Sequence, residues 1–265
     1  MRQFILPDDW DEGPNCLIEG GRAHYIARVL RLGPGDSFPG RDSSGRLWKC
    51  AVLEQRPGRL LLSIAPRAEG AEGEYRLESL PRILLVQGLP KGLKMDLVVR
   101  QATEAGVTAV LPLLSGRSLA RGASRGEEGG GTRGGRWERI VREALQQSGS
   151  SIPTRVLEPL ELAALPAALA SFGLSPSDPR ILLHEAPLAQ SSMHEYLTGA
   201  PEAVALCVGP EGGFAQDEID FLVKEGFKPL RLAGAVLRAE TAALYAIAAV
   251  QIILSERSSW IPKPP

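Results

Sequence analysis

Apolar positions follow two different spacings along this chain, and the change comes near residue 82. From there on, apolar runs without polar alternation end at glycine or proline and alternate with segments of helical spacing, which predicts buried strands separated by helices. The expected strands are 83–87, 109–114, 155–157, 181–184, 204–208 and 230–232, and the expected helices are 95–105, 137–145, 160–172, 216–225 and 239–254. This order favours an α/β domain with a mostly parallel sheet covered on both faces.

Before residue 66 the expected strands are short, and turns separate them. Strands are expected at 4–6, 17–19, 47–54 and 60–64, with a hairpin turn at 56–59 and a short helix at 24–32. The stretch 66–80, rich in Glu, Gly and Ala, indicates a linker. The sequence therefore predicts a small β-rich module. Small barrels of this kind often bind nucleic acid, and ordinary surface charge explains the scattered arginines equally well.

Charge is distributed unevenly, although the formal net charge of the 265 residues is only −1. Residues 82–142 carry 11 basic and 5 acidic side chains, whereas residues 143–265 carry 8 and 14. The low-complexity stretch 118–135 is expected to be mobile, and it adjoins a helix whose polar face carries Arg136 and Arg139. This basic segment indicates a nucleic-acid surface, with a solvated face as the alternative.

Several other classes of protein are disfavoured. The three cysteines and three histidines are far apart, so no metal site is expected and a reducing cytoplasmic setting fits. The N-terminus lacks an apolar leader segment, and the apolar run 242–254 is shorter than the ~20 residues that span a bilayer. A buried helix and no membrane partner are therefore expected. No predicted strand is followed by a dinucleotide, phosphate-loop or nucleophile-elbow motif.

Two glycine-containing loops follow predicted strands one βα unit apart. The first, 209–213, carries the carboxylate of Glu211 and two adjacent glycines, which permit positive φ and close backbone approach. The second is 233–235. Loops at the carboxyl ends of parallel strands bind ligands in open α/β sheets. We therefore expect a shared ligand site here, in preference to two ordinary turns.

Sequence blocks over nearly the whole chain resemble one family. Gly209-Pro-Glu-Gly-Gly-Phe214 with Val236-Leu-Arg-Ala-Glu-Thr-Ala242 resembles the signature of the SPOUT methyltransferases, and among them the bacterial 16S ribosomal RNA uridine N(3)-methyltransferase family RsmE. The further blocks are His24-Tyr-Ile-Ala-Arg-Val-Leu-Arg-Leu32, Lys91-Gly-Leu-Lys-Met-Asp96, Gln101-Ala-Thr-Glu-Ala-Gly-Val107 and Glu143-Ala-Leu-Gln-Gln-Ser148.

The resemblance implies a PUA-like RNA-binding barrel over 1–70 and a SPOUT domain over 76–260, with a trefoil knot at about 180–255. It also implies a cytoplasmic homodimer that binds S-adenosylmethionine without a metal and acts on 16S ribosomal RNA within the assembled small subunit. The implied cofactor contacts are Leu183, His184, Glu185, Val208, Gly209, Pro210, Glu211, Gly212, Gly213, Leu232, Ala233, Ala235, Val236, Leu237 and Ala239. The implied RNA contacts are Arg2, Arg22, Arg31, Lys91, Lys94, Arg117, Arg136 and Arg139.

The implied reaction is methyl transfer to N-3 of a uridine in the decoding region of 16S ribosomal RNA, and this nitrogen must first lose its proton. Arg238 would stabilise the developing uracil anion, and Glu240 would orient Arg238 or accept the proton. For Glu240 the alternative is a favourable interaction with a helix N-terminus.

The chain departs from the family pattern at three places. Ser150 stands where related sequences usually carry an arginine, Ala233-Gly234-Ala235 stands where they usually have Gly-Pro-Arg, and Arg238-Ala-Glu-Thr241 stands where they usually have Arg-Thr-Glu-Thr. These departures concern RNA contacts more than the cofactor loops. Two other functions therefore stay open. One is a related methyltransferase acting on transfer RNA or another ribosomal site, and the other is an RNA-binding assembly factor without catalysis.

Overall fold

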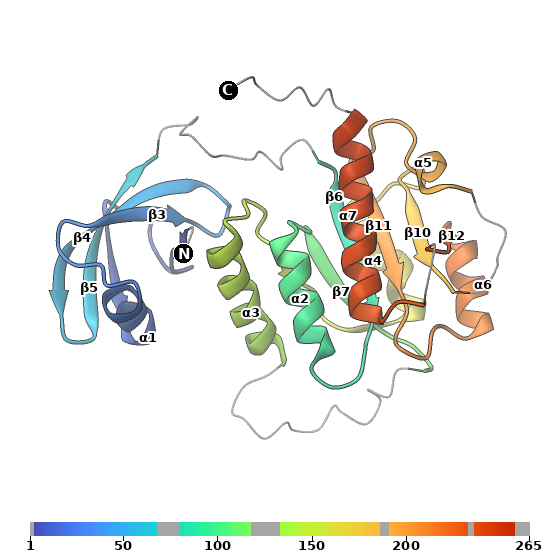
Figure 1. Cartoon of the computed structure of the whole chain (residues 1–265), viewed down its shortest axis with the longest axis horizontal. Coiled ribbons are helices and arrows are strands. Elements are labelled where there is room, and N and C mark those ends of the chain that lie inside the picture. Colours follow the sequence, from blue (N-terminus) through green and yellow to red (C-terminus); the bar gives the residue numbers. More distant parts are fainter. Residues whose placement is uncertain (1–2, 68–79, 118–132, 186–190, 233–235, 258–265) are drawn as a thin grey trace. The chain divides into compact units, whose positions relative to one another are not determined.

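The computed structural model describes residues 3–67, 80–117, 133–185, 191–232 and 236–257 (Figure 1). The chain forms two compact units, one of residues 1–76 with 142–153, the other of residues 77–141 with 154–265. The first is a β-sheet with short helical turns, and the second is an α/β structure.

A five-stranded sheet in the order β1-β3-β4-β5-β2 forms the first unit. β1 and β3 are parallel, and all other neighbours are antiparallel. The elements are β1 (Phe4–Ile5), β2 (Asn15–Glu19), α1 (Gly20–His24), the π-helical turn η1 (Tyr25–Val29), β3 (Ser37–Arg41), β4 (Leu47–Arg56) and β5 (Arg59–Pro66). Alternate residues along β4 and β5 are buried, so the hairpin gives one face to the core.

The predicted hairpin is confirmed, whereas two neighbouring elements differ from the expectation. The helix expected at 24–32 begins at Gly20, continues as η1 and ends before Arg31, which adopts a φ of 58°. β3 is not predicted by the apolar pattern, because Pro39 and Gly40 interrupt it. It forms because β1 and β4 pair with it on its two sides.

The sheet of the second unit is wholly parallel in its described strands, in the order β12-β10-β11-β6-β7-β8, with β9 also paired to β7. The strands are β6 (Arg82–Gly88), β7 (Ala109–Leu114), β8 (Arg155–Val156), β9 (Leu160–Glu161), β10 (Arg180–Leu183), β11 (Ala203–Val208) and β12 (Lys228–Leu230). β6, β7 and β11 are buried along nearly their whole length, as their continuous apolar runs predict.

Helices cover both faces of this sheet (Figure 1). They are α2 (Lys94–Glu104), α3 (Arg133–Ser148), the 3-10 turn η4 (Leu162–Ala164), α4 (Leu165–Phe172), α5 (Met193–Tyr196), α6 (Gln216–Lys224) and α7 (Ala239–Arg257). On one face, Leu169 of α4 and Leu222 of α6 share a core with Leu84 of β6. α7 contacts β11 and α2. The expected mostly parallel, covered sheet is confirmed.

Three elements of the second unit are displaced from their predicted positions. Residues 160–161 pair with β7 as a strand instead of starting a helix. α4 begins at Leu165 and places Pro166 in its first turn, where the missing N–H removes no helical hydrogen bond. β12 ends at Leu230, where the strand was expected to begin.

The apolar run near the C-terminus forms a longer helix than predicted. α7 spans Ala239–Arg257, so it is long and apolar enough to cross a membrane, and the argument from the length of residues 242–254 is wrong. Half of the window Ala239–Glu256 is nevertheless buried, including Ala246 and Ile247. This burial beside β11 and α2 is typical of a core helix.

Candidate functional site

Four parallel strands end at one edge of the second unit's sheet. The register pairs Val208 of β11 with Gln87 of β6 and with Leu183 of β10, and it pairs Leu183 with Leu230 of β12. The loops after these residues therefore start side by side (Figure 1). From β6 the chain continues to β7 on one side, and from the neighbouring β11 it continues to β12 on the other side, across β10. Ligands bind in parallel sheets where the strand order reverses in this way.

The first predicted glycine loop is a tight turn directly after β11. The amide of Gly213 donates to the carbonyl of Pro210 at 2.9 Å, and Gly213 adopts a φ of 65°. Glycine takes this left-handed conformation without steric strain. Of the two adjacent glycines, only Gly213 needs it. Phe214 is 5% exposed and anchors the end of the loop in the core.

Gly88, the last residue of β6, lies against this loop. A Cβ added to Gly88 would be 2.5 Å from Cδ of Pro210 and 2.7 Å from its nitrogen. Both distances are far inside normal van der Waals contact. Glycine at this position is therefore what lets β6 and the loop approach each other. Sequence reasoning misses Gly88, because its partner lies far along the chain.

Gln87, the preceding residue, is wholly buried. Its Nε2 donates to the carbonyl of Gly88 at 3.0 Å and to the carbonyls of Val208 and Gly209 at 3.4 Å. Because all three neighbours are acceptors, the amide nitrogen must face them. Oε1 is left buried without a hydrogen-bond partner, which costs about 1–3 kcal/mol. Gln87 thus holds the start of the loop at a cost in stability, and sequence reasoning misses it too.

Glu211 ties the loop to the beginning of α2. Its Oε1 accepts a hydrogen bond from Nζ of Lys94 at 2.6 Å, and both carboxylate oxygens lie 3.2 Å from the amide nitrogen of Lys91. Burial raises the pKa of Glu211, but hydrogen bonds from Lys94 and from backbone amides, with the charge of Lys94, bring that pKa below its usual value. The predicted cofactor contact Glu211 and the predicted RNA contact Lys94 are therefore paired with each other.

Two further contacts reach the loop and the start of α6 from the segment after β7. Nη1 of Arg117 donates to the carbonyl of Gly212 at 2.8 Å. Glu218 is 8% exposed and accepts from the amides of Gly116 at 2.6 Å and Ala215 at 2.8 Å. Glu218 is not predicted from the sequence, although its place three residues after Ala215 is the spacing of a helix cap.

The predicted catalytic residues lie at the start of α7. The amide of Ala242 donates to the carbonyl of Arg238 at 2.8 Å, and Arg238 is exposed. Glu240 is 8% exposed, and its Oε2 has no hydrogen-bond partner. Within the part of the chain that the structure describes, no hydrogen bond or ion pair joins Arg238 to Glu240.

The other predicted cofactor residues differ in exposure. Leu183, Val208 and Ala239 are buried, His184, Leu232 and Leu237 are partly exposed, and Glu185 and Val236 are exposed. The amide of His184 donates to the carbonyl of Leu230 at 3.0 Å, which continues the pairing of β10 with β12. Ala233 and Ala235 lie outside the described residues. Among those that are described, no group of three or more His, Cys, Asp or Glu side chains could hold a metal ion.

The predicted RNA contacts are distributed over both units. Arg31, Lys91, Arg117 and Arg139 are exposed, whereas Arg2 and most of the stretch 118–135 lie outside the described residues. Arg136 forms an ion pair with Asp96, which also accepts from Nε1 of Trp137 at 3.2 Å.

Arg22 is half-buried in the first unit. Its guanidinium lies 5.1 Å from the ring centroid of Phe4 and donates to the carbonyl of Ile5. Burial, followed by the nearby charge of Arg142, lowers the pKa of Arg22. Arg22 therefore already has partners within the unit.

Ser150 lies inside the first unit and not on its surface. It is 6% exposed, and its carbonyl accepts from Nε2 of Gln3 at 3.0 Å. Oε1 of Gln3 in turn accepts from Nε of Arg41 at 2.7 Å. The serine at this position therefore belongs to a buried polar network.

Two family models match the chain. An RNA methyltransferase domain matches residues 78–251, and an RNA methyltransferase PUA domain matches residues 18–64. Curated relatives named ribosomal RNA small subunit methyltransferase E match most of the chain. The protein of Synechocystis sp. is 33% identical over 96% of this chain and 78% of its own length. The protein of Aquifex aeolicus is 31% identical over 86% of this chain and 90% of its own length.

Solved structures share the fold. The ribosomal RNA small subunit methyltransferase E from Neisseria gonorrhoeae, bound to S-adenosyl methionine, is 26% identical and aligns with a TM-score of 0.76 over 96% of this chain and 98% of its own. A methyltransferase from Legionella pneumophila in complex with S-adenosylmethionine is 24% identical, with a TM-score of 0.78 over 95% and 97%. The expected SPOUT α/β fold with a PUA-like β-rich unit before it is confirmed. The chain belongs to the ribosomal RNA small subunit methyltransferase E family.

Proposed function

We propose that this protein is an S-adenosylmethionine-dependent methyltransferase that modifies N-3 of a uridine in 16S ribosomal RNA. The observation that carries the proposal is the held glycine loop 209–213 at the carboxyl edge of the sheet, in a chain of this family. The expected SPOUT domain, 76–260, would hold the cofactor, and the expected PUA-like barrel, 1–70, would bind RNA. The protein would act in the cytoplasm on the assembled small subunit. The trefoil knot at about 180–255 stays a prediction.

The residues at this edge suit S-adenosylmethionine. Leu183 and Leu237 offer apolar contact at the ends of two loops, and a Cβ added to Gly212 would meet only the side chain of Arg117, at 3.5 Å. The loop is therefore open at Gly212, apart from the Arg117 side chain. Glu240 adds a buried carboxylate oxygen that the protein itself does not use. When bound, this cofactor supplies an electrophilic methyl group.

The protein must remove the proton from N-3 and stabilise the negative charge that spreads over the uracil ring. Glu240 offers Oε2 as an acceptor for the proton. Arg238 offers a planar fork of donors to a uracil carbonyl oxygen. Both lie at the start of α7, where the helix dipole also favours negative charge. That dipole alone would account for Glu240 if the residue has no role in proton transfer.

The proposal also includes the association of two copies of the chain. α2 and α7 pack together, and residues on or beside them expose large apolar side chains. They are Leu93, Leu97, Leu244, Tyr245 and Ile252. Neighbouring exposed apolar groups suit an interface between protomers. The proposed assembly is a homodimer, and light scattering, which gives the molar mass, tests it.

Mass mapping of ribosomal and transfer RNA from a strain that lacks the gene tests the substrate. The proposal expects one methyl group to disappear from a uridine of 16S ribosomal RNA and to return with the gene. A change confined to transfer RNA or another ribosomal site would instead indicate a related methyltransferase. Unchanged methylation of all these RNAs would indicate an RNA-binding assembly factor.

Arg238→Ala tests the mechanism. The single-turnover rate should fall on the order of 10²–10³, as when one donor to an oxyanion is lost. Affinity for S-adenosylmethionine should change little, because backbone groups hold that ligand. Arg238→Lys should restore part of the rate, since the charge returns without the planar fork.

The control is Arg155→Ala, which removes an exposed arginine of β8 beside the amino end of β7. This variant should methylate normally. If Arg238→Ala melts early or dissociates into monomers, yet methylates at the normal rate when dimeric, Arg238 is structural and the catalytic assignment is wrong.

A further inference from the structure

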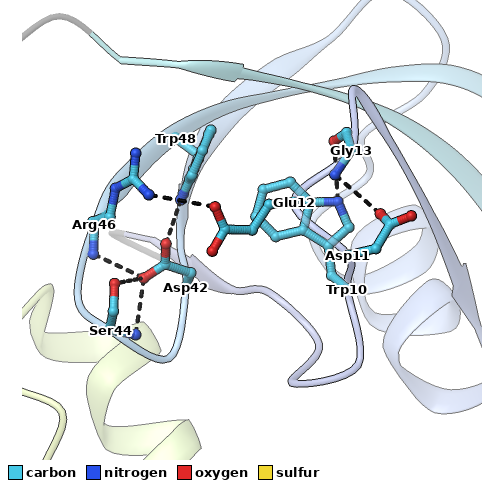
Figure 2. Close-up of polar contacts among 8 residues, drawn as sticks. All are labelled: Trp10, Asp11, Glu12, Gly13, Asp42, Ser44, Arg46 and Trp48. Atoms are coloured by element: carbon cyan, nitrogen blue, oxygen red, sulfur yellow. Dashed lines mark hydrogen bonds and ion pairs between the residues drawn. The ribbon is translucent and has the colours of Figure 1, made fainter.

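The loop between β3 and β4 in the first unit is fixed by one carboxylate (Figure 2). Oδ1 of Asp42 accepts from the amide and hydroxyl of Ser44 at 2.9 and 2.6 Å and from the amide of Arg46 at 2.9 Å. Oδ2 accepts from Nε1 of Trp48 at 2.8 Å. Burial raises the pKa of Asp42, but these hydrogen bonds lower it further than burial raises it. These hydrogen bonds therefore fix the conformation of the loop, and with it the positions of the side chains that the loop carries.

That loop presents an arginine on an aromatic ring. The guanidinium carbon of Arg46 lies 4.9 Å from the centroid of the Trp48 ring. Trp48 is itself 6% exposed and is packed edge-on by Trp10, with ring centroids 4.9 Å apart. Arg46 remains 61% exposed. Because one face of the guanidinium rests on the indole, its hydrogen-bonding edge stays available to an anion.

A carboxylate of the same unit already lies at that edge. Oε2 of Glu12 is 3.4 Å from Nη1 of Arg46, and the Glu12 side chain is 64% exposed. Glu12 adopts a φ of 58°, which is uncommon for a residue other than glycine. Its neighbours support this conformation, since Oδ1 of Asp11 accepts from the amide of Gly13 at 3.0 Å and Trp10 donates to the Gly13 carbonyl at 3.2 Å. Figure 2 shows the two loops facing each other.

Among the described residues of this unit, two other exposed ion pairs lack such a support. Arg56 pairs with Glu54 at 3.0 Å and Arg59 pairs with Glu19 at 2.6 Å, but the structure shows neither guanidinium resting on an aromatic ring. Exposed pairs of this kind contribute little to stability. The Arg46 pair differs from them because its loop is fixed by Asp42 and its guanidinium lies on the Trp48 ring. This difference points to a role of Arg46 in binding a ligand.

We propose that Arg46, seated on Trp48, binds a phosphate of the RNA backbone, and that Glu12 occupies this position until the RNA displaces it. The inference rests on the proposed function, since it takes the substrate to be RNA. A carboxylate and a phosphate offer the same pair of anionic oxygens to a guanidinium, so one can replace the other. Both residues belong to the expected RNA-binding barrel, and Arg46 and Trp48 lie within the segment that matches the PUA model.

Binding to assembled small ribosomal subunits over a series of salt concentrations tests the proposal. Arg46→Ala should weaken binding by on the order of tenfold and lower the log–log salt slope by roughly 0.7–0.9, the share of one phosphate contact. The substitution keeps the backbone amide that Asp42 uses, so the loop should remain ordered. Glu12→Gln should strengthen binding, because the competing charge is gone. The double variant should bind like Arg46→Ala, since Glu12 acts only through Arg46.

Arg56→Ala is the matched control, because it also removes an exposed, ion-paired arginine of the same unit. Equal losses for Arg46→Ala and Arg56→Ala would overturn the proposal, and so would a gain from Glu12→Gln that persists without Arg46. If Arg46→Ala melts early, Glu12→Gln in an otherwise native chain decides, and unchanged affinity there overturns it. Methyl transfer by the wild type distinguishes a failure of the proposed function from a failure of the Arg46 site. A wild type that neither binds small subunits nor methylates their 16S ribosomal RNA overturns the proposed function. Normal methylation by the wild type, with variants whose binding is unaltered, overturns only the Arg46 site.

Discussion

Replacing Gly88 with alanine should displace the glycine loop after β11. The added Cβ would lie 2.5 Å from Cδ of Pro210, 2.7 Å from its nitrogen and 3.1 Å from the carbonyl carbon of Gly209. Carbon atoms in normal contact are about 3.5–4.0 Å apart, so the two segments must separate by roughly 1 Å. β6 is paired on both sides, by β11 and β7, and is buried. The loop is therefore the part that moves.

The size of the effect follows from that displacement. Overpacking a well-packed site costs about 1–3 kcal/mol. For a protein of this size, each kcal/mol corresponds to a fall in melting temperature of roughly 2–4 °C. A shift of about 1 Å in a group that positions a reactant can cost about 10²-fold in rate. Gly88→Ala should therefore lower affinity for S-adenosylmethionine and the methyl-transfer rate much more than it lowers stability.

Calorimetric titration with S-adenosylmethionine, single-turnover kinetics and thermal unfolding measure the three quantities. Gly134→Ala is the control, because a Cβ there meets nothing within 4 Å and alanine favours the helix α3 in which it lies. Gly212→Ala should also be tolerated in stability, since its Cβ meets only the Arg117 side chain at 3.5 Å. If Gly88→Ala binds and reacts like Gly134→Ala, the close approach of β6 does not set the loop, and the reasoning fails.

Two further predictions concern the contacts that hold the same loop. Gln87→Met removes the donors to Val208 and Gly209 together with the unpaired Oε1, so cofactor affinity should fall about tenfold while the melting temperature changes by only a few degrees. Gln101→Met, which removes another buried unpaired Oε1 from α2, should leave affinity unchanged, and equal losses would contradict the role of Gln87. The pKa of Glu211 is lowered in the folded state, so its stabilising effect should be complete above its unfolded value near 4.5 and disappear as the pH falls through the folded value. The difference in melting temperature between wild type and Glu211→Gln should shrink accordingly on acidification, and a difference that persists at low pH would show that charge is not its cause.

Strands and turns that are specified by their own residues are predicted well from the sequence. The apolar run 109–114 coincides with β7, and the turn at 56–59 lies between β4 and β5 as expected. β3 and β9 are missed, because tertiary pairing creates them. Pro39 and Gly40 weaken any strand pattern in β3, and β9 exists only through its partners Leu113 and Leu114 in β7.

The candidate site likewise contains residues that the sequence predicts and residues that only the fold reveals. The turn at 209–213 is visible in the sequence, because glycine and proline mark it locally. Gln87 and Gly88 carry no local signal of their roles, since both act on a loop some 120 residues away that β6 meets only through pairing with β11. Periodicity can predict that β6 is buried, but not which carbonyls its last side chain faces.

The two parts of the candidate site, the loop after β11 and the start of α7, differ in how many contacts they make within the protein. The β11 loop is held by three other segments, through Gln87 and Gly88, through Lys94, and through Arg117. At the start of α7, by contrast, Arg238 is exposed and Oε2 of Glu240 lacks a hydrogen-bond partner. A loop fixed in advance suits a ligand that must bind without reorganisation, whereas groups awaiting a partner suit charge that develops only during reaction. Substitutions around the β11 loop should therefore change cofactor affinity first, and substitutions at the start of α7 should change the chemical step first.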